Sequence, residues 1–281
     1  MNSKPASKLV SLAVFIILSV FAVFCLAPFF FLLLSSLRPG VEMIRNGISL
    51  HIDFKALNFA NYRLLIDGKD GIYPIWYFNS LAITALHTLV SLFFTSMVGY
   101  ALAVYDFKGK KLIFTIVLVV MMIPVEILIL PLYKLAIGIH LIDTYLGVIL
   151  PFVVAPTSIF FFRQYAATLP RELIDAGRID GCSEFRIFFQ IMVPLMLPAF
   201  GAMGILQAMF SWNGFVWPLI VLRSNEMLTL PIGLQSLITP YGNNYDLLFP
   251  GAVMSVIPIL LVFIMNQKAF ISGLTVGGVK G

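Results

Sequence analysis

The stretch LPRELIDAGRIDGCSEFRIFFQIMVPLMLP, residues 169–198, decides how the rest of the chain is organised. It is the most charged run of the sequence, and apolar segments of membrane-spanning length lie on both sides of it. Its charged side chains are Arg171, Glu172, Asp175, Arg178, Asp180, Glu184 and Arg186. A polar insert between two spans is where a membrane protein usually meets something soluble, so we expect a docking site here.

The composition indicates a membrane protein. Of the 281 residues, 60% are hydrophobic and 11% are charged, whereas soluble domains carry about 25% charged residues. Lipid must therefore cover part of the apolar surface, and the net charge of +5 is not taken as a sign of nucleic-acid binding.

Cys25 and Cys182 are expected at different depths in the membrane, which argues against a disulfide between them. The three histidines are scattered, so no metal site is expected.

Six apolar segments predict an all-α, polytopic protein with one transmembrane domain over residues 1–281, because about 20 apolar residues cross a bilayer. The expected spans are residues 9–37, 79–104, 112–132, 145–162, 198–222 and 250–265. The first is nearly twice the apolar length of a signal peptide, which indicates an uncleaved helix. Two external loops, 38–77 and 223–249, and the polar insert 169–194 complete the predicted organisation.

Basic residues predict the orientation. With the N-terminus inside, eleven of the 18 Lys and Arg residues fall in inner segments and seven in the longer outer ones. The positive-inside rule therefore places both termini and the insert in the cytoplasm.

The insert itself predicts two short helices joined by a turn. Pro170 suits the first turn of a helix, Gly181 can end that helix in the left-handed conformation, and Ser183 can cap the next one. The second helix carries an apolar stripe of Phe185, Phe188, Phe189 and Met192. Small residues in and after the first helix, Ala176, Gly177 and Gly181, would let another protein's backbone approach. On pattern alone, a loop with interfacial amphipathic helices fits equally well.

A resemblance favours the docking interpretation. Residues 175–181, DAGRIDG, followed by Phe188, Ile191 and Pro194, resemble the EAA signature of binding-protein-dependent ABC importer permeases. The surrounding stretch is most similar to the sugar branch, in particular to the smaller permease subunit of the maltose type. Three other stretches also resemble this family: Phe78–Ser80, Ser211–Asn213 with Trp217–Pro218, and the terminal residues 273–281. Asp175, Gly177 and Cys182 depart from the pattern, which has Glu, Ala and commonly Ala there.

The resemblance implies a transport subunit that is not an enzyme, in the plasma membrane of a prokaryote. It would move a sugar or oligosaccharide, delivered by an extracellular solute-binding protein, by alternating access. The implied partners are a second homologous permease and an ATPase dimer. This chain lacks the G-x-x-x-x-G-K-[ST] phosphate loop, so it would bind no cofactor itself, and ATP and Mg²⁺ would sit on the ATPase.

The resemblance also assigns residues. Those expected to couple to the ATPase are Glu172, Asp175, Ala176, Gly177, Asp180, Gly181 and Ser183. The tail, with Gly277, Gly278 and Lys280, is expected to reach the same partner, although a frayed end fits as well. The external loop, with Tyr241, Asn243 and Asn244, is expected to contact the binding protein.

Five further residues are candidates for the translocation path: Glu126, Gln207, Ser211, Trp212 and Asn213. Sugars bind through hydrogen bonds and aromatic stacking, which these side chains could provide. Contacts between helices explain the fifth-span group equally well, and an interfacial, hydrated position for Glu126 is slightly favoured.

Other functions are weaker alternatives. The same importer class could carry another solute such as glycerol 3-phosphate, but a phosphate calls for Arg or Lys in the path and no span interior has one. An ion-coupled secondary sugar transporter predicts inverted repeats and intramembrane charges, and the sequence shows one internal acid and no repeat. No motif of an intramembrane enzyme is present.

Overall fold

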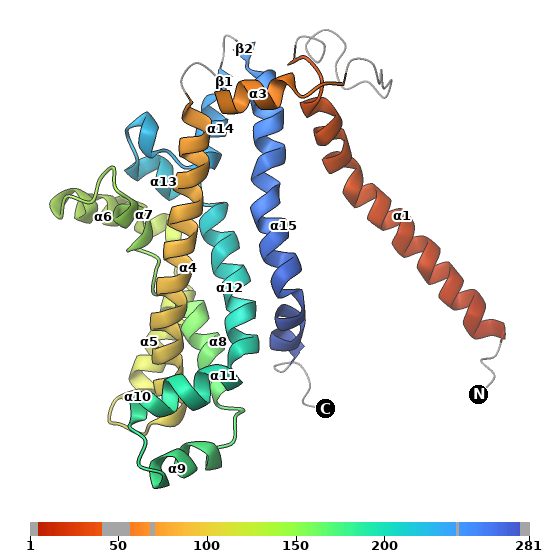
Figure 1. The fold of residues 1–281 in the computed structure, drawn as a ribbon. Helices are drawn as coiled ribbons and strands as arrows, with labels where there is room; N and C mark the ends of the chain where they lie inside the picture. Colours follow the sequence, from red (N-terminus) through yellow and green to blue (C-terminus); the bar gives the residue numbers. More distant parts are fainter. Residues whose placement is uncertain (1–4, 41–56, 68–70, 240–241, 276–281) are drawn as a thin grey trace. The chain divides into compact units, whose positions relative to one another are not determined.

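A computed structural model describes residues 5–40, 57–67, 71–239 and 242–275, and most of them are helical (Figure 1). The strand pairing within these residues is limited to β1 (Ile238–Thr239) and β2 (Gly242–Asn243), which are antiparallel. The all-α prediction is thus confirmed. The chain divides into two compact units, Met1–Tyr73 with Leu234–Val256, and Pro74–Gly233 with Ile257–Gly281.

The first unit contains α1 (Pro5–Ser36), α3 (Ala60–Asp67) and the beginning of α15 (Tyr245–Thr275). Side chains all around α1 are apolar and exposed, as in Phe24 with 80% of its surface free, and such a helix needs lipid around it. The end of α1 is tied to α3 because the Asn61 amide donates to the carbonyls of Ser36 and Arg38, at 3.1 and 2.7 Å. The first bond satisfies a carbonyl that the helix end leaves open, and the second holds the residues that follow α1.

The second unit is built around α4 (Ile72–Val104), which packs on α8 (Pro156–Ala166) and α12 (Leu197–Trp212). At Gly99 the backbones of α4 and α8 come so close that a Cβ atom would lie 2.9 Å from the Arg163 nitrogen and the Ile159 oxygen. Tyr100, Phe162 and Met203 belong to the fully buried core of this unit. Glycine at position 99 is therefore required by helix packing.

A sharp break interrupts the expected third span, 112–132. The chain forms α5 (Lys110–Met121) and α6 (Val125–Gly138), which are bent by 102° relative to each other. Pro124 stands at the break in an extended conformation, with φ −61° and ψ 129°, and a proline disfavours helical geometry in the residue before it. The sequence predicted one span here, with Pro124 inside it, and the structure has two helices.

The expected fourth and fifth spans are also composite. Residues 145–162 contain α7 (Tyr145–Ile149) and the start of α8, and residues 198–222 contain most of α12 followed by α13 (Val216–Val221). Three described helices are long and apolar enough to cross a membrane, Val10–Ser36, Ile72–Val104 and Tyr245–Gln267, or five if each of two bent pairs counts as one span. The count of six spans stays a prediction.

The polar insert forms a helical hairpin that leads into α12. Its elements are α9 (Glu172–Ile179), α10 (Glu184–Ile187), a π-helical turn (Phe188–Met192) and α11 (Val193–Leu195). The segment Glu184–Leu195 is bent by 79° from α12, with Pro198 in the first turn of α12. Beyond α13, a 3₁₀ turn (Asn225–Met227) and α14 (Leu230–Ser236) follow.

Candidate functional site

The inner face of α9 packs against the chain's own following segment. Ile174 is 3% exposed and Gly177 is buried. A Cβ atom at Gly177 would lie 2.9 Å from Ile191 Cδ1 and 3.1 Å from Ile187 Cγ1. The expectation that Gly177 makes room for another protein's backbone is therefore wrong for this structure, because the space is filled from within.

The outer face of α9 is open and partly apolar. Ile179 is 86% exposed and Leu173 is 39% exposed, and Ala176 lies between them on the same side. Acidic residues border this strip: Glu172, Asp175 and Asp180 are all exposed. Leu173 and Ile179 were not among the coupling residues assigned from the sequence, although the spacing 173, 176, 179 marks one side of a helix.

The turn between α9 and α10 has the predicted geometry. Gly181 adopts a left-handed φ of 75°, its amide donates to Arg178 O at 3.0 Å, and the Cys182 amide donates to Gly177 O at 2.9 Å. This pair of bonds closes the helix end, as expected for a glycine stop. Ser183 caps α10, since its hydroxyl accepts from the Arg186 amide at 3.3 Å.

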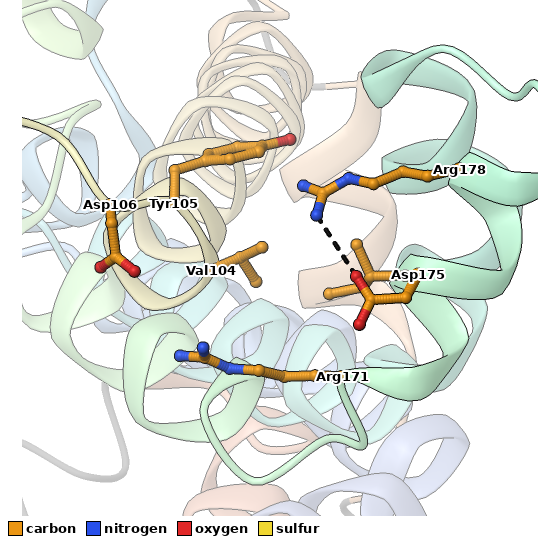
Figure 2. Close-up of a pocket in the computed structure, with 7 residues that line it drawn as sticks. Val104, Tyr105, Asp106, Arg171, Asp175 and Arg178 are labelled. Atoms are coloured by element: carbon orange, nitrogen blue, oxygen red, sulfur yellow. Dashed lines mark hydrogen bonds and ion pairs between the residues drawn. The ribbon is translucent and has the colours of Figure 1, made fainter.

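A charged network connects this hairpin to the end of α4. Arg178 donates to Glu184 twice, from Nε at 2.8 Å and from Nη2 at 3.3 Å, and the Tyr105 hydroxyl donates to the same carboxylate at 2.7 Å. A pocket of about 260 Å³ lies beside this network, lined from α9 and from the end of α4. Figure 2 shows Arg171 and Arg178 reaching from the hairpin towards Val104 and Tyr105.

The network shifts the protonation equilibria of its members. The hydrogen bonds from Arg178 and then Tyr105 lower the pKa of Glu184 below its ordinary value. Partial burial, together with the bond to Glu184, raises the pKa of Tyr105. At neutral pH Glu184 is therefore a carboxylate and Tyr105 a neutral phenol that donates to it.

Gln207, a candidate for the translocation path, is engaged inside the helix bundle. Its Oε1 lies 3.2 Å from His87 Nε2 on α4, and its Nε2 donates to the Ser158 hydroxyl on α8 at 2.8 Å. All three side chains are at most 6% exposed. This chain of bonds joins three helices, so Gln207 acts here as a contact between helices.

The other path candidates are placed at helix ends. Trp212 is 4% exposed and meets the Tyr77 ring edge-on at 5.8 Å, while Ser211 is half-buried. Asn213 is exposed and donates to Met209 O in its own helix at 2.9 Å. Glu126 lies exposed in the first turn of α6. Ser211, Trp212 and Asn213 share the end of α12, and Glu126 belongs to another element.

A second polar cluster holds the segment that follows α13. The Asn79 amide donates to Glu226 O and Leu228 O at 2.7 and 2.9 Å, and its oxygen accepts from the Tyr145 hydroxyl. The Leu230 amide donates to the Ser80 hydroxyl at 2.7 Å. Asn79 and Ser80 thus fix the start of α14, a role that the sequence match at 78–80 did not reveal.

Asp143, which lies just before α7, also binds the segment that follows α13. Its carboxylate accepts from the Arg223 and Ser224 amides at 2.8 and 3.1 Å and from the Ser224 hydroxyl at 2.7 Å. Partial burial raises the pKa of Asp143, but these hydrogen bonds and the Arg223 charge outweigh it, so the pKa lies below its ordinary value.

The remaining predicted contact residues are described only in part. Asn244 is exposed, and its side-chain oxygen accepts from the Leu247 amide at 3.3 Å at the start of α15. Asn243 lies in β2. Tyr241, Gly277, Gly278 and Lys280 lie outside the described residues. Within the described part of the chain, no three His, Cys, Asp or Glu side chains are grouped to hold a metal ion.

Comparison with known proteins decides the family. The model of the family described as "binding-protein-dependent transport system inner membrane component" matches residues 95–270. The chain belongs to this family. The matched region runs from the second half of α4 into α15, and it includes the hairpin, Asn213 and the anchored segment after α13. As a member of a membrane transport family, the chain is a transport component and an integral membrane protein.

Relatives of this inner membrane component differ in the solute that their names state. The arabinooligosaccharides transport system permease protein AraQ of Bacillus subtilis (strain 168) is 56% identical over 281 residues, which is 100% of both chains. The sn-glycerol-3-phosphate transport system permease protein UgpE of Brucella suis biovar 1 (strain 1330) is 28% identical over 97% of this chain and 98% of its own.

A solved structure supports the fold. A chain of a bacterial ABC transporter involved in the import of the acidic polysaccharide alginate superposes with a TM-score of 0.83 at 22% identity, covering 96% of this chain and 99% of the other. At this identity the likeness concerns the fold of the inner membrane component alone.

Proposed function

We propose that this chain is the permease subunit of an ATP-driven importer and that it translocates a sugar or oligosaccharide handed over by an extracellular binding protein. The observation that carries the proposal is the construction of α9. Its inner face is packed by Ile174 and Gly177, while Leu173, Ala176 and Ile179 stand free on the outside. An apolar strip exposed on a polar hairpin is a surface that a soluble partner can cover.

The partner that fits this strip is an ATPase dimer on the cytoplasmic side, which would bind the ATP and Mg²⁺. The positive-inside distribution supports a cytoplasmic hairpin and cytoplasmic termini, in the plasma membrane of a prokaryote. The exposed residues Glu172, Asp175, Ala176, Asp180 and Gly181 lie on or beside the strip. ATP-driven closure of the dimer would move α9. The helices attached to α9 would then open the path to one side of the membrane and close it to the other.

The same proposal includes two further proteins. A second homologous permease would complete the path, and the exposed apolar surfaces of α4, α5 and α12 are available to it as well as to lipid. The binding protein would dock on the external segment 223–249, which Asn79, Ser80 and Asp143 hold in place at its beginning. Asn243 and Asn244 are the contact residues that we propose within it.

An oligosaccharide is the favoured solute. The relative from Bacillus subtilis carries arabinooligosaccharides in its name, with 56% identity over the whole chain, and Ser211, Trp212 and Asn213 offer neutral polar and aromatic groups at the end of α12. Glycerol 3-phosphate is the second candidate, on the strength of the 28% identical relative. α12 carries no Lys or Arg to meet a phosphate.

The test is reconstitution. This chain, tagged and extracted in mild detergent, is expected to co-purify with a second permease and an ATPase. Proteoliposomes of that complex with its binding protein should accumulate labelled arabino-oligosaccharide only when ATP is present. The chain alone should show neither ATP hydrolysis nor uptake. Uptake by the chain alone, or uptake by the complex without ATP, contradicts the proposal. Accumulation of glycerol 3-phosphate instead selects the second candidate.

A further inference from the structure

The Glu184 carboxylate lies between two elements that are far apart in the sequence. From one side, the Arg178 guanidinium on α9 donates through Nε and Nη2, at 2.8 and 3.3 Å. From the other, the hydroxyl of Tyr105, the residue that follows α4, donates at 2.7 Å. Both carboxylate oxygens are thus occupied, and Glu184 bridges α9 and the end of α4.

The other attachments of α9 lead both to the core and into its own hairpin, since Ile174 belongs to the buried cluster that contains Tyr100 and Phe162. Gly177 meets Ile187 and Ile191, and the turn at Gly181 is closed by backbone bonds to Arg178 and Gly177. Between α9 and the end of α4, by contrast, lies the pocket of about 260 Å³ shown in Figure 2. Apolar packing is incomplete at this place, so the polar bridge makes a direct connection across it.

The end of α4 is itself held firmly. The Lys110 ammonium donates to Ala103 O at 3.3 Å and pairs with Asp106 at 3.1 Å. The Tyr105 ring packs edge-on against Tyr100, which is 2% exposed in the core of the unit, with ring centroids 5.7 Å apart. A displacement that reaches Tyr105 is therefore passed to the buried part of α4.

We infer that Tyr105, Glu184 and Arg178 form a polar latch through which movement of α9 is transmitted to α4. The inference rests on the proposed function, in which an ATPase moves α9. All three act as positioning residues: none needs to touch the solute or the ATPase. The forked pair of bonds fixes orientation as well as distance, which a single contact to an ammonium would not do.

Because the latch residues are partly exposed, their effect on transport can be measured apart from any effect on folding stability. Arg178 and Glu184 keep 43% and 46% of their side-chain surfaces free, and exposed ion pairs contribute little to folding stability. Cutting the latch should therefore leave the protein folded and the complex assembled. What should change is the amount of solute moved for each ATP hydrolysed.

The experiment uses the complete complex with its binding protein in proteoliposomes and measures solute uptake and ATP hydrolysis together. Tyr105→Phe and Glu184→Gln should each lower the ratio of uptake to hydrolysis several-fold, with unchanged assembly. The matched control is Arg186→Gln, because Arg186 is an exposed arginine on α10 whose guanidinium bonds Gln190 in its own segment at 2.8 Å. This control should keep the wild-type ratio.

Charge reversal provides the decisive comparison. Arg178→Glu and Glu184→Arg should each lower the ratio, and the double variant should restore it to at least about half of the wild-type value, because the pair is rebuilt with its charges exchanged. The latch is refuted if Tyr105→Phe and Glu184→Gln match Arg186→Gln, or if the double variant is as impaired as the singles. Failure of the wild-type complex to assemble or to transport with ATP would instead refute the proposed function.

Discussion

Gly177 lies where α9 meets the segment that follows it. Because glycine has no side chain, Ile187 and Ile191 of that segment can pack against the helix. A Cβ atom at this position would meet Ile191 Cδ1 at 2.9 Å and Ile187 Cγ1 at 3.1 Å, and the first is the mobile end of a side chain. Glycine is thus preferred here for packing, and the neighbouring Ala176 faces outward. Gly177 therefore serves packing within the chain, whereas Ala176 is free to contact a partner.

This assignment predicts different effects at adjacent positions. Gly177→Leu should lower the apparent melting temperature of the detergent-solubilised protein, since overpacking a core typically costs about 1–3 kcal/mol. Gly177→Ala should be nearly neutral, because its small clash is offset by a gain in helix propensity of about 1 kcal/mol. Ala176→Leu should leave melting unchanged and weaken co-purification with the ATPase. Wild-type melting of Gly177→Leu would contradict the assignment.

At the scale of elements, two sites restrain the segment after α13 before it enters α14. Asn79 and Ser80 on α4 bind the backbone between Glu226 and Leu230. Asp143, in a left-handed conformation with φ 59° that aspartate tolerates, binds the backbone at Arg223 and Ser224. The beginning of the external segment is therefore a fixed platform.

The Asp143 anchor predicts a dependence on pH. Its pKa is lowered in the folded protein, so the carboxylate stabilises the fold above the ordinary pKa of 3.8, and this contribution is lost as the pH falls through the lower folded value. Asp143→Asn keeps the left-handed preference and removes the charge. Because the site is partly exposed, the difference at pH 7 should be at most about 1 kcal/mol, or about 2–4 °C in apparent melting temperature.

Melting curves of wild type and Asp143→Asn between pH 7 and pH 3 test this prediction. The gap should be present at neutral pH and close towards pH 3. A gap of the same size at every pH would show that the charge of Asp143 is not what anchors the segment.

Local patterns in the sequence predicted the hairpin because its determinants are local. Gly181 and Ser183 act on their own turn of backbone and lie where the pattern placed them. Pro170 was expected in the first turn of the helix, but it lies before Arg171, the residue that caps α9. The inner face of α9, the Glu184 bridge and the bond from His87 to Gln207 were not predicted, since each depends on which element packs opposite. A period of 3.6 residues marks a face without naming its neighbour.

At the scale of the whole molecule, apolar composition and span-length runs predicted an all-α membrane protein, and the fold confirms it. The bends within the expected spans were not predicted, although Pro124 stands at the 102° break between α5 and α6. A proline in an apolar run shows where a helix can break, while the direction of the next helix depends on tertiary packing. The assignment of translocation and contact residues stays a proposal.

Cross-linking from the outer face of α9 in native membranes tests whether this face docks on the ATPase. In a Cys25→Ala, Cys182→Ala background, Ile179→Cys places a thiol at an 86% exposed position. The control is Ile139→Cys, 53% exposed, which lies between the expected spans 112–132 and 145–162 and therefore outside in the predicted orientation. A thiol-to-amine cross-linker should join position 179 to an ATPase subunit and should not join position 139 to it. If a thiol at 179 reacts freely with a small maleimide yet yields no ATPase adduct, the outer face of α9 does not dock on the ATPase.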